Sequence, residues 1–266
     1  MDETSRSLKT MTRETKGNGK ISNVLVLGGS SGIGLGIAKN LNIQGFKVFI
    51  MDRNVPTEEG RAFHSGFFQF DLTAIGTVGS LTDLIPSSLK FDHLVITAGG
   101  VQQQEVQNLK EGKPFWSLSD EVIDATIRLN LTYQILFVNR FLKVFSAAAN
   151  RSITLTSSVN SVGRYGLTVY SASKAGLEGF TRAAAEDLGR IGVRVNCVLP
   201  GSVKTAASIR ENMNFEVAAK QSLLNRMNEP EDIAEVVSLF VNSNAITGQC
   251  YVCDSGQSLK GMSGRY

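Results

Sequence analysis

Short apolar runs recur along the chain, and most are followed by a stretch with helical periodicity. Within the runs, apolar and polar residues do not alternate, which is typical of strands buried on both faces of a parallel sheet. The runs predict seven strands, at Asn23–Leu27, Lys47–Met51, Phe67–Phe70, Leu94–Thr97, Ile153–Thr156, Arg194–Leu199 and Gln249–Val252. Helical patterns lie between them, at Gly34–Asn42, Val78–Ile85, Ser119–Ala149, Ala172–Arg190 and Ile233–Val241. The pattern predicts one α/β domain, a doubly wound parallel sheet of seven strands with helices on both faces.

The composition is that of an ordinary globular protein, with one bias that concerns the backbone. The chain has 266 residues, of which 42% are hydrophobic and 19% charged, so it can bury a core without disulfide or metal cross-links. Glycine is frequent, at 26 residues, whereas proline is scarce, at 5. This bias indicates positions where the backbone needs to do without a Cβ atom, and it does not come from Pro-Gly linkers.

Charge and hydropathy exclude two classes of partner. The formal net charge is +3, and five cations and three acids in the first twenty residues contribute +2 of it. The rest of the chain is therefore nearly neutral and lacks the basic stripe of a nucleic-acid-binding protein. No apolar stretch is long enough to cross a membrane. We predict that residues 1–20 are a disordered polar tail, with an organelle transit peptide as the alternative, and that residues 21–266 form the domain.

The cysteines indicate a reducing environment. Cys250 and Cys253 form a C-x-x-C pair, which could be half a zinc site or a redox pair. Their segment is predicted to be a strand, however, and residues three apart on a strand point to opposite faces. We therefore expect reduced thiols and a cytoplasmic location. No carboxylate or histidine cluster has metal-ligand spacing, so no metal site is predicted.

A glycine-rich turn follows the first predicted strand. It reads Gly28-Gly29-Ser30-Ser31-Gly32-Ile33-Gly34, and an amphipathic helical pattern begins there. Glycines in this arrangement allow a tight turn and a close approach to a pyrophosphate, while the helix N-terminus offers N–H groups to the anion. The position between a strand and a helix distinguishes this cluster from an ordinary tight turn and predicts a dinucleotide site.

An acidic residue ends the second predicted strand and bears on the choice of cofactor. Asp52 can accept hydrogen bonds from both adenosine ribose hydroxyls and would repel a 2′-phosphate, which favours NAD. Arg53 is the counter-argument, because a guanidinium there could bind the phosphate of NADP. Asp71, after the third strand, could meet the adenine or only cap the next helix.

Tyr170 and Lys174 form the candidate catalytic pair. They are four residues apart in a helical pattern and so share one helix face. A lysine ammonium beside a phenol favours the phenolate, so Tyr170 could act as a general base towards an alcohol or as an acid towards a carbonyl. A serine at the end of the fifth strand, Ser157 or Ser158, could bond the same substrate oxygen. Strand alternation favours Ser158.

Together these motifs resemble the short-chain dehydrogenase/reductase family, in its single-domain members of about 250 residues with a Rossmann-type fold. The resemblance covers residues 21–256. Its motifs, in order, are Gly28-x-x-x-Gly32-x-Gly34, Thr97-Ala98-Gly99, Leu129-Asn130-Leu131, Ser158 with Tyr170-x-x-x-Lys174, Pro200-Gly201-Ser202-Val203-Lys204-Thr205, and Asp254-Ser255-Gly256.

The resemblance implies a role for each matching residue. Tyr170 would be the general acid/base, Ser158 would orient the substrate oxygen, Lys174 would also hold the nicotinamide ribose, and Asn130 would anchor a water in a proton relay. The implied cofactor-binding residues are Gly28, Ser30, Ser31, Gly32, Ile33, Gly34, Asp52, Arg53, Asp71, Leu72, Ala98, Gly99, Tyr170, Lys174, Pro200, Gly201, Val203 and Thr205. The family is commonly homotetrameric or homodimeric, which implies a homo-oligomer.

The chain departs from the family pattern at three places. Leu27 and Thr97 replace a threonine and an asparagine on neighbouring strands, so both ends of one family contact are replaced. The interval from Ser158 to Tyr170 is one residue short, and Ser157 would restore it. We expect residues 100–117 and 204–225 to shape the substrate pocket.

The sequence thus predicts an oxidoreductase that transfers a hydride between NAD(H) and a secondary alcohol or ketone, a small molecule. An NADP-dependent carbonyl reductase of the same family is the first alternative. A catalytically idle dinucleotide-binding sensor or subunit is the second, since a fold alone does not establish an activity.

Overall fold

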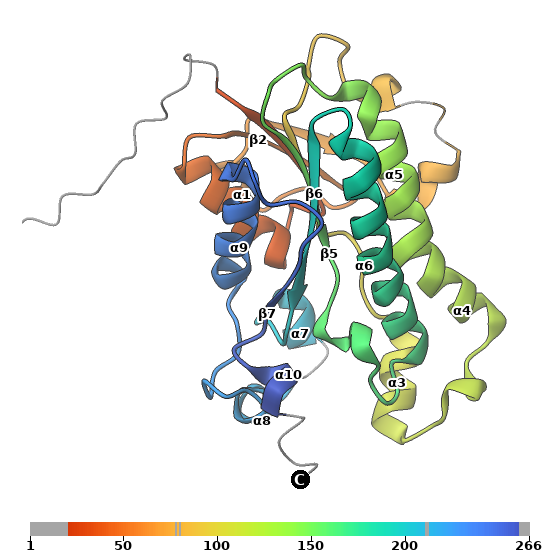
Figure 1. Cartoon of the computed structure of the whole chain (residues 1–266). Coiled ribbons are helices and arrows are strands. Elements are labelled where there is room, and N and C mark those ends of the chain that lie inside the picture. Colours follow the sequence, from red (N-terminus) through yellow and green to blue (C-terminus); the bar gives the residue numbers. More distant parts are fainter. Residues whose placement is uncertain (1–20, 78, 80, 211–212, 261–266) are drawn as a thin grey trace, which may run out of the picture.

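The computed structural model describes residues 21–260 except 78, 80, 211 and 212. The predicted tail at residues 1–20 lies outside the described residues. Seven parallel strands form one sheet in the order β3-β2-β1-β4-β5-β6-β7 (Figure 1). The strands are β1 Asn23–Leu27, β2 Lys47–Asp52, β3 Gly66–Gln69, β4 His93–Ile96, β5 Arg151–Thr156, β6 Val193–Pro200 and β7 Cys250–Cys253. All seven predicted strands are present, with boundaries within two residues of those expected.

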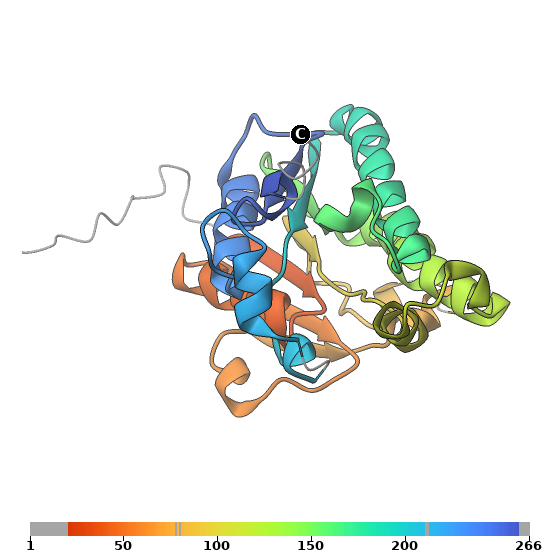
Figure 2. The same ribbon diagram turned by 90° about the horizontal axis from the view of Figure 1, so that it is seen from below.

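Helices cover both faces of the sheet, as predicted. The α-helices are α1 Gly32–Ile43, α2 Glu58–Arg61, α3 Gln103–Glu111, α4 Asp120–Ile127, α5 Tyr133–Phe141, α6 Thr168–Gly189, α7 Ala206–Arg210, α8 Phe215–Lys220, α9 Pro230–Asn242 and α10 Gln257–Lys260. Helices α1 and α9 lie on one face, and α4, α5 and α6 on the other (Figures 1 and 2). No helix of the described residues is long and apolar enough to cross a membrane.

Alternate residues of each strand pack into two separate cores. Leu25 and Leu27 of β1 join the core beneath α5 and α6, whereas Val24 and Val26 join the core beneath α1 and α9. A strand buried on both faces is apolar at most positions, which is why the apolar runs do not alternate.

Two predicted helices differ from the structure. In the segment 78–85, the described residues form only a 3₁₀ turn, Leu81–Asp83, because Pro86 directly follows the short apolar run. The long helix expected over 119–149 is divided: a π-helical turn, Arg128–Thr132, separates α4 from α5, and a 3₁₀ turn, Leu142–Val144, ends it. Asn130 is the middle residue of the π-helical turn.

The order of the strands places a crevice at the centre of the sheet. The chain winds from β1 outwards to β3 and then returns to β4, so β1 and β4 are neighbours whose following loops diverge to opposite faces. In sheets of this kind, ligands bind outside the carboxyl ends of the strands at such a point.

Candidate active site

The turn after β1 is tight and lies against β4. Gly28 has a φ of +87°, and a Cβ atom on it would lie 2.7 Å from the backbone nitrogen of Ala98. At Gly34, in the first turn of α1, a Cβ atom would lie 2.1 Å from the carbonyl oxygen of Gly28. Both positions therefore require glycine, and part of the glycine excess is explained by this packing.

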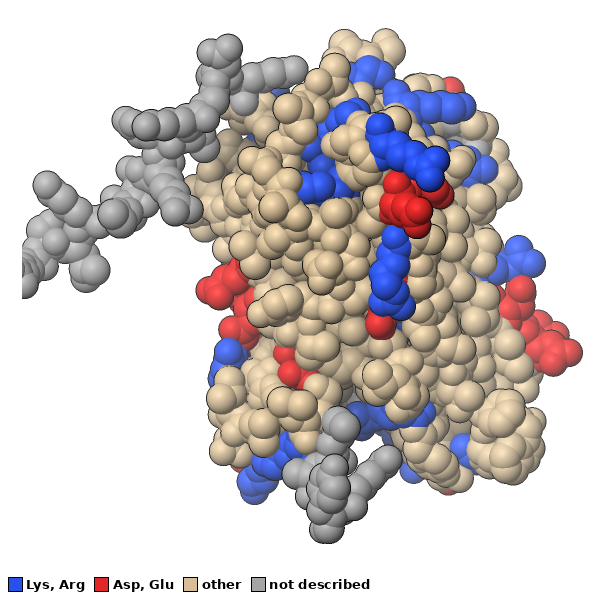
Figure 3. Space-filling model, in the orientation of Figure 1, with Lys and Arg blue, Asp and Glu red and all other residues tan. Residues whose placement is uncertain are grey.

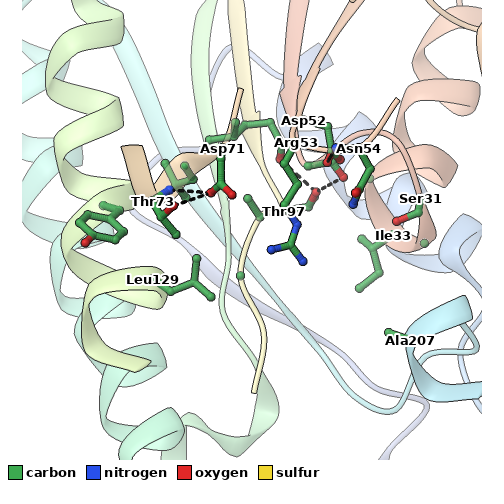
Figure 4. Close-up of a pocket in the computed structure, with 18 of the residues that line it drawn as sticks. Ser31, Ile33, Asp52, Arg53, Asn54, Asp71, Thr73, Thr97, Leu129 and Ala207 are labelled. Atoms are coloured by element: carbon green, nitrogen blue, oxygen red, sulfur yellow. Dashed lines mark hydrogen bonds between the residues drawn. The ribbon is translucent and has the colours of Figure 1, made fainter. Parts of the chain in front are cut away.

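A cavity of about 730 Å³ opens at this turn, beside the N-terminus of α1 (Figure 4). Its lining includes most of the residues that the sequence assigned to the cofactor: Gly28, Ser31, Gly32, Ile33, Gly34, Asp52, Arg53, Asp71, Leu72, Ala98, Gly99 and Thr205. No acidic residue stands in the first turn of α1, so its N–H groups and helix dipole favour an anion there. The glycine turn and the acid-free helix start fit the pyrophosphate of a dinucleotide.

Asp52 lies at the end of β2, where its carboxylate is held in place by backbone groups. Its Oδ2 accepts a hydrogen bond from the N–H of Ser30 at 3.1 Å, and its Oδ1 accepts one from Asn54 at 3.0 Å. Arg53 is exposed, and Figure 4 shows its guanidinium pointing into the cavity. The Asp52 carboxylate, which favours NAD, and the Arg53 guanidinium, which favours NADP, thus line the same cavity.

Asp71 caps the turn that follows β3. Its Oδ1 accepts hydrogen bonds from the backbone N–H and the hydroxyl of Thr73, at 2.9 and 2.8 Å. The same residue lines the cavity (Figure 4). The sequence left two alternatives for Asp71, a helix cap or a contact with the adenine. The structure shows that Asp71 can cap the turn and still face the cavity.

Two side chains at the glycine turn, Ser30 and Thr97, donate hydrogen bonds to backbone carbonyls of neighbouring segments. Ser30 does not line the cavity: its hydroxyl donates to the carbonyl of Asn54 at 2.7 Å and so ties the turn to the end of β2. Thr97, one of the departures from the family pattern, donates from Oγ1 to the carbonyls of Leu27 and Gly28, at 3.1 and 3.0 Å. Thr97 therefore links the two neighbouring strands without a side-chain partner at position 27.

A second cavity, of about 460 Å³, adjoins the first and shares Ile33, Thr97, Gly99, Thr205 and Ala207 with it. It brings together the predicted catalytic residues Ser158, Tyr170 and Lys174 with Pro200, Gly201 and Val203. Segments 100–117 and 204–225 both contribute to its lining, as expected. Its apolar lining residues include Val101, Val106, Leu109, Val159, Leu167 and Met213. The described residues that line it include no aspartate or glutamate.

Lys174 is buried at the base of the second cavity. Its Nζ donates to the carbonyl of Thr156 at 2.8 Å and lies 5.6 Å from the ring centroid of Tyr170. Removal from water lowers the pKa of Lys174 to about 8. An ammonium has three donors, so the bond to Thr156 uses only part of its capacity.

The two serines after β5 point to different surroundings. The hydroxyl of Ser157 donates to the carbonyl of Lys174 at 3.0 Å and contacts Oε1 of Glu178 at 3.2 Å, so it faces α6. Ser158 Oγ accepts a hydrogen bond from the N–H of Asn160 at 3.1 Å, at the start of the next turn. The contacts of Ser157 with α6 favour Ser158 as the serine available to a substrate.

Asn130 lies in the π-helical turn between α4 and α5. Its Oδ1 accepts from the N–H of Gly100, and its Nδ2 donates to the carbonyls of Gly100 and Thr126, all within 3.0 Å. Both N–H groups of the amide and one lone pair of its oxygen are thus used by Gly100, in the loop after β4, and by Thr126 of α4. π-Helical turns are frequent at functional sites, and this one fixes the loop that borders both cavities.

Glu105, on α3, was not identified from the sequence. It is fully buried, and its Oε1 accepts the backbone N–H of Tyr170 at 3.1 Å and also that of Val169. Thr126 Oγ1 donates to its Oε2 at 3.3 Å. Burial raises the pKa of Glu105. Glu105 caps the start of α6, and no local pattern reveals this because 65 residues separate Glu105 from Tyr170.

The remaining candidates stay away from both cavities. Cys250 packs with the core beneath α6, and Cys253 with the core beneath α9, so the two point to opposite faces as expected. The described residues include no group of three or more potential metal ligands. On the face shown in Figure 3, charged side chains form separate groups around a broad uncharged area, with no continuous basic stripe.

The chain is similar to known proteins over most of its length. A family model described as Enoyl-(Acyl carrier protein) reductase matches residues 28–258. The 3-oxoacyl-[acyl-carrier-protein] reductase FabG of Rickettsia prowazekii is 31% identical, over 87% of this chain and 95% of its own. Carbonyl reductase family member 4 of Danio rerio is 27% identical, over 88% and 97%. The crystal structure of an oxidoreductase (short chain dehydrogenase/reductase family) from Burkholderia thailandensis superimposes with a TM-score of 0.77 at 28% identity, covering 92% and 96% of the two chains.

Proposed function

Because the chain belongs to the short-chain dehydrogenase/reductase family, whose members are NAD(P)-dependent oxidoreductases acting on small molecules, we propose that it interconverts a ketone and a secondary alcohol. The observation that carries this proposal is the meeting of Ser158, Tyr170 and Lys174 in a cavity that adjoins the glycine turn. The nicotinamide, when bound, would give or take the hydride.

In the direction of reduction, the Tyr170 hydroxyl donates its proton to the substrate oxygen as the hydride reaches the adjacent carbon. Ser158 donates a hydrogen bond to the same oxygen and fixes its position. The positive charge of Lys174, 5.6 Å from the ring, stabilises the phenolate left behind. In oxidation the same groups act in reverse, with Tyr170 as the base.

The Tyr170 proton must be replaced after each turnover. Both side-chain N–H groups of Asn130 are bonded to the protein and its Oδ1 accepts one hydrogen bond, so a water anchored by Asn130 would donate to Oδ1 or to the backbone carbonyl. The apolar lining of the second cavity suits a substrate whose carbonyl is attached to a hydrocarbon body, and relatives named 3-oxoacyl-[acyl-carrier-protein] reductase and carbonyl reductase act on carbonyl groups.

The cofactor assigned here is NAD, because the carboxylate of Asp52 is held at the cavity by two backbone N–H groups and would repel a 2′-phosphate. NADP is the alternative, favoured by the guanidinium of Arg53. We expect a homo-oligomer in the cytoplasm, as the family resemblance implies.

A Tyr170→Phe variant tests the assignment of the acid/base. Turnover is followed by the absorbance of the reduced nicotinamide over a panel of ketones and secondary alcohols. We expect kcat to fall by about 10²- to 10⁴-fold with little change in folding. Tyr165→Phe is the matched control, since Tyr165 is 71% exposed and should keep full activity. Undiminished turnover by Tyr170→Phe would contradict the proposal, and no turnover by the parent protein would favour an idle dinucleotide-binding protein.

A further inference from the structure

Two of the three cysteines, Cys197 and Cys250, lie side by side, and they are not the two of the C-x-x-C motif. Cys197 on β6 and Cys250 on β7 are direct partners in the register of these parallel strands. Partners in register point to the same face of a sheet, and both residues belong to the core beneath α6. Neighbouring strands are about 4.8 Å apart, which falls inside the range of Cα separations that a disulfide spans.

The two thiols are in contact and differ in their surroundings. As register partners on one face of the sheet, each thiol shifts the pKa of the other. Cys197 is fully buried, whereas Cys250 is partly exposed on the edge strand. Arg182 Nη1 of α6 lies 3.4 Å from the sulfur of Cys250. The Cys197 thiol lowers the pKa of Cys250, and Arg182 acts in the same direction, while Cys250 and burial keep Cys197 protonated.

Cys197 is also adjacent to the catalytic group. In the register of β5 and β6, Cys197 pairs with Leu155, and the N–H of Ser157 donates to the carbonyl of the next residue, Val198, at 2.9 Å. The charge of Lys174 interacts with the Cys197 thiol. Ser157 in turn holds the carbonyl of Lys174. Displacing the sulfur of Cys197 therefore disturbs the residues that position Ser158 and Lys174.

We propose that Cys197 and Cys250 form a peroxide-sensitive dithiol whose reversible conversion to a disulfide lowers the turnover of the neighbouring active site. The partly exposed Cys250 thiolate attacks hydrogen peroxide: a sulfur–oxygen bond forms, the oxygen–oxygen bond breaks, and hydroxide leaves and takes up a proton, giving water. Cys197 then attacks the sulfur of this sulfenic acid. The sulfur–sulfur bond forms, the sulfur–oxygen bond breaks, and a second water carries away the Cys197 proton. Two thiols are oxidised and one peroxide is reduced.

The product is tested on the full-length protein without reference to activity. After exposure to a small excess of hydrogen peroxide, the free-thiol count should fall from the three cysteines of the chain to one. The intact mass should fall by two hydrogens, and peptide mapping should show a Cys197–Cys250 link that dithiothreitol removes. A Cys250–Cys253 link, a link between chains, or sulfinic acid at Cys250 with Cys197 still free would each overturn the proposal, as would no reaction at all.

The effect on turnover is measured with matched variants. Cys253→Ser removes the cysteine on the other face of β7 and should lose activity several-fold with peroxide and regain it with dithiothreitol, like the parent. Cys250→Ser should keep its activity under the same treatment. Equal losses in Cys250→Ser, or a disulfide without a loss in the parent, would overturn the coupling to the active site. This second readout rests on the proposed function; if the reduced protein has no turnover, the proposed function fails while the mass measurement still decides the disulfide.

Discussion

Lys174 places a cation in the protein interior, and this has an energetic cost that depends on pH. Its pKa is lowered to about 8 in the folded protein, against 10.5 in an exposed lysine. Between these values the unfolded chain binds the proton and the folded chain does not, so stability rises with pH in that window. Below pH 8 both states are protonated and the cost is fully present. At about 1.4 kcal/mol per pKa unit, the cost is on the order of 3 kcal/mol.

A Lys174→Met variant isolates this contribution. We expect the free energy of unfolding of the parent, measured relative to the variant by urea denaturation, to increase from pH 8 to pH 10. The same variant should lose turnover, since it lacks the charge beside Tyr170. Parallel pH profiles of parent and variant would show that Lys174 is not desolvated in the folded state.

Helix α3 joins the loop after β4 to helix α6, which carries Tyr170 and Lys174. The link is Glu105, which accepts the N–H groups of Val169 and Tyr170 in the first turn of α6. Glu105→Ala should leave these donors unpaired and destabilise the protein by about 1–2 kcal/mol. It should also reduce kcat, because Tyr170 loses its anchor.

Glu105→Gln keeps a carbonyl oxygen at this position and should retain most of the activity. Glu111→Gln, on the same helix but paired with Lys113 at the surface, is the control and should change stability by less than about 0.5 kcal/mol. Thermal denaturation and steady-state kinetics measure both effects. A Glu105→Ala variant that matches Glu111→Gln in both would show that α3 does not support α6.

The elements that could be predicted from the sequence are those that leave a pattern within a short stretch of residues. The inner strands are largely apolar because both of their faces are buried, as at Val24–Leu27 of β1, and such a run is visible in a short stretch of sequence. The π-helical turn at Asn130 accompanies hydrogen bonds to Gly100, which is 30 residues away in the sequence. Helix α3 is short and mostly polar, so it lacks the apolar run that reveals a strand. The sequence separated Cys250 from Cys253 correctly, but the pairing of Cys197 with Cys250 follows from strand register and has no local signal. The glycine turn and the Tyr170–Lys174 pair were visible because each is a compact motif.

The first cavity is built from segments that are far apart in the chain, from the glycine turn after β1 to Thr205. A ligand that joins them binds the folded state alone, and at 100 times its Kd it adds about 2.7 kcal/mol of stability. For a chain of this size that corresponds to a rise in Tm of roughly 5–10 °C.

We expect NAD to give this shift and NADP a smaller one, measured by thermal denaturation. Asp52→Asn should reduce the shift with NAD, whereas Asp83→Asn, in an exposed turn, should not. Stabilisation by NADP alone would assign the site to the phosphorylated cofactor and give Arg53 the decisive role.

The order of the strands also has a consequence for how the chain reaches its native state. Strand β1 pairs with the central strand β4, and Leu27 and Thr97, which are in contact, are 70 residues apart. Every other pairing in the sheet is parallel and likewise requires a crossover. The chain loses the entropy of loop closure before the stabilising contacts between distant strands can form. We therefore expect slow folding for a protein of this size. During synthesis, β1 cannot pair with β4 until β4 has left the ribosome. In that interval the edge of β1 that pairs with β4 is exposed to other chains.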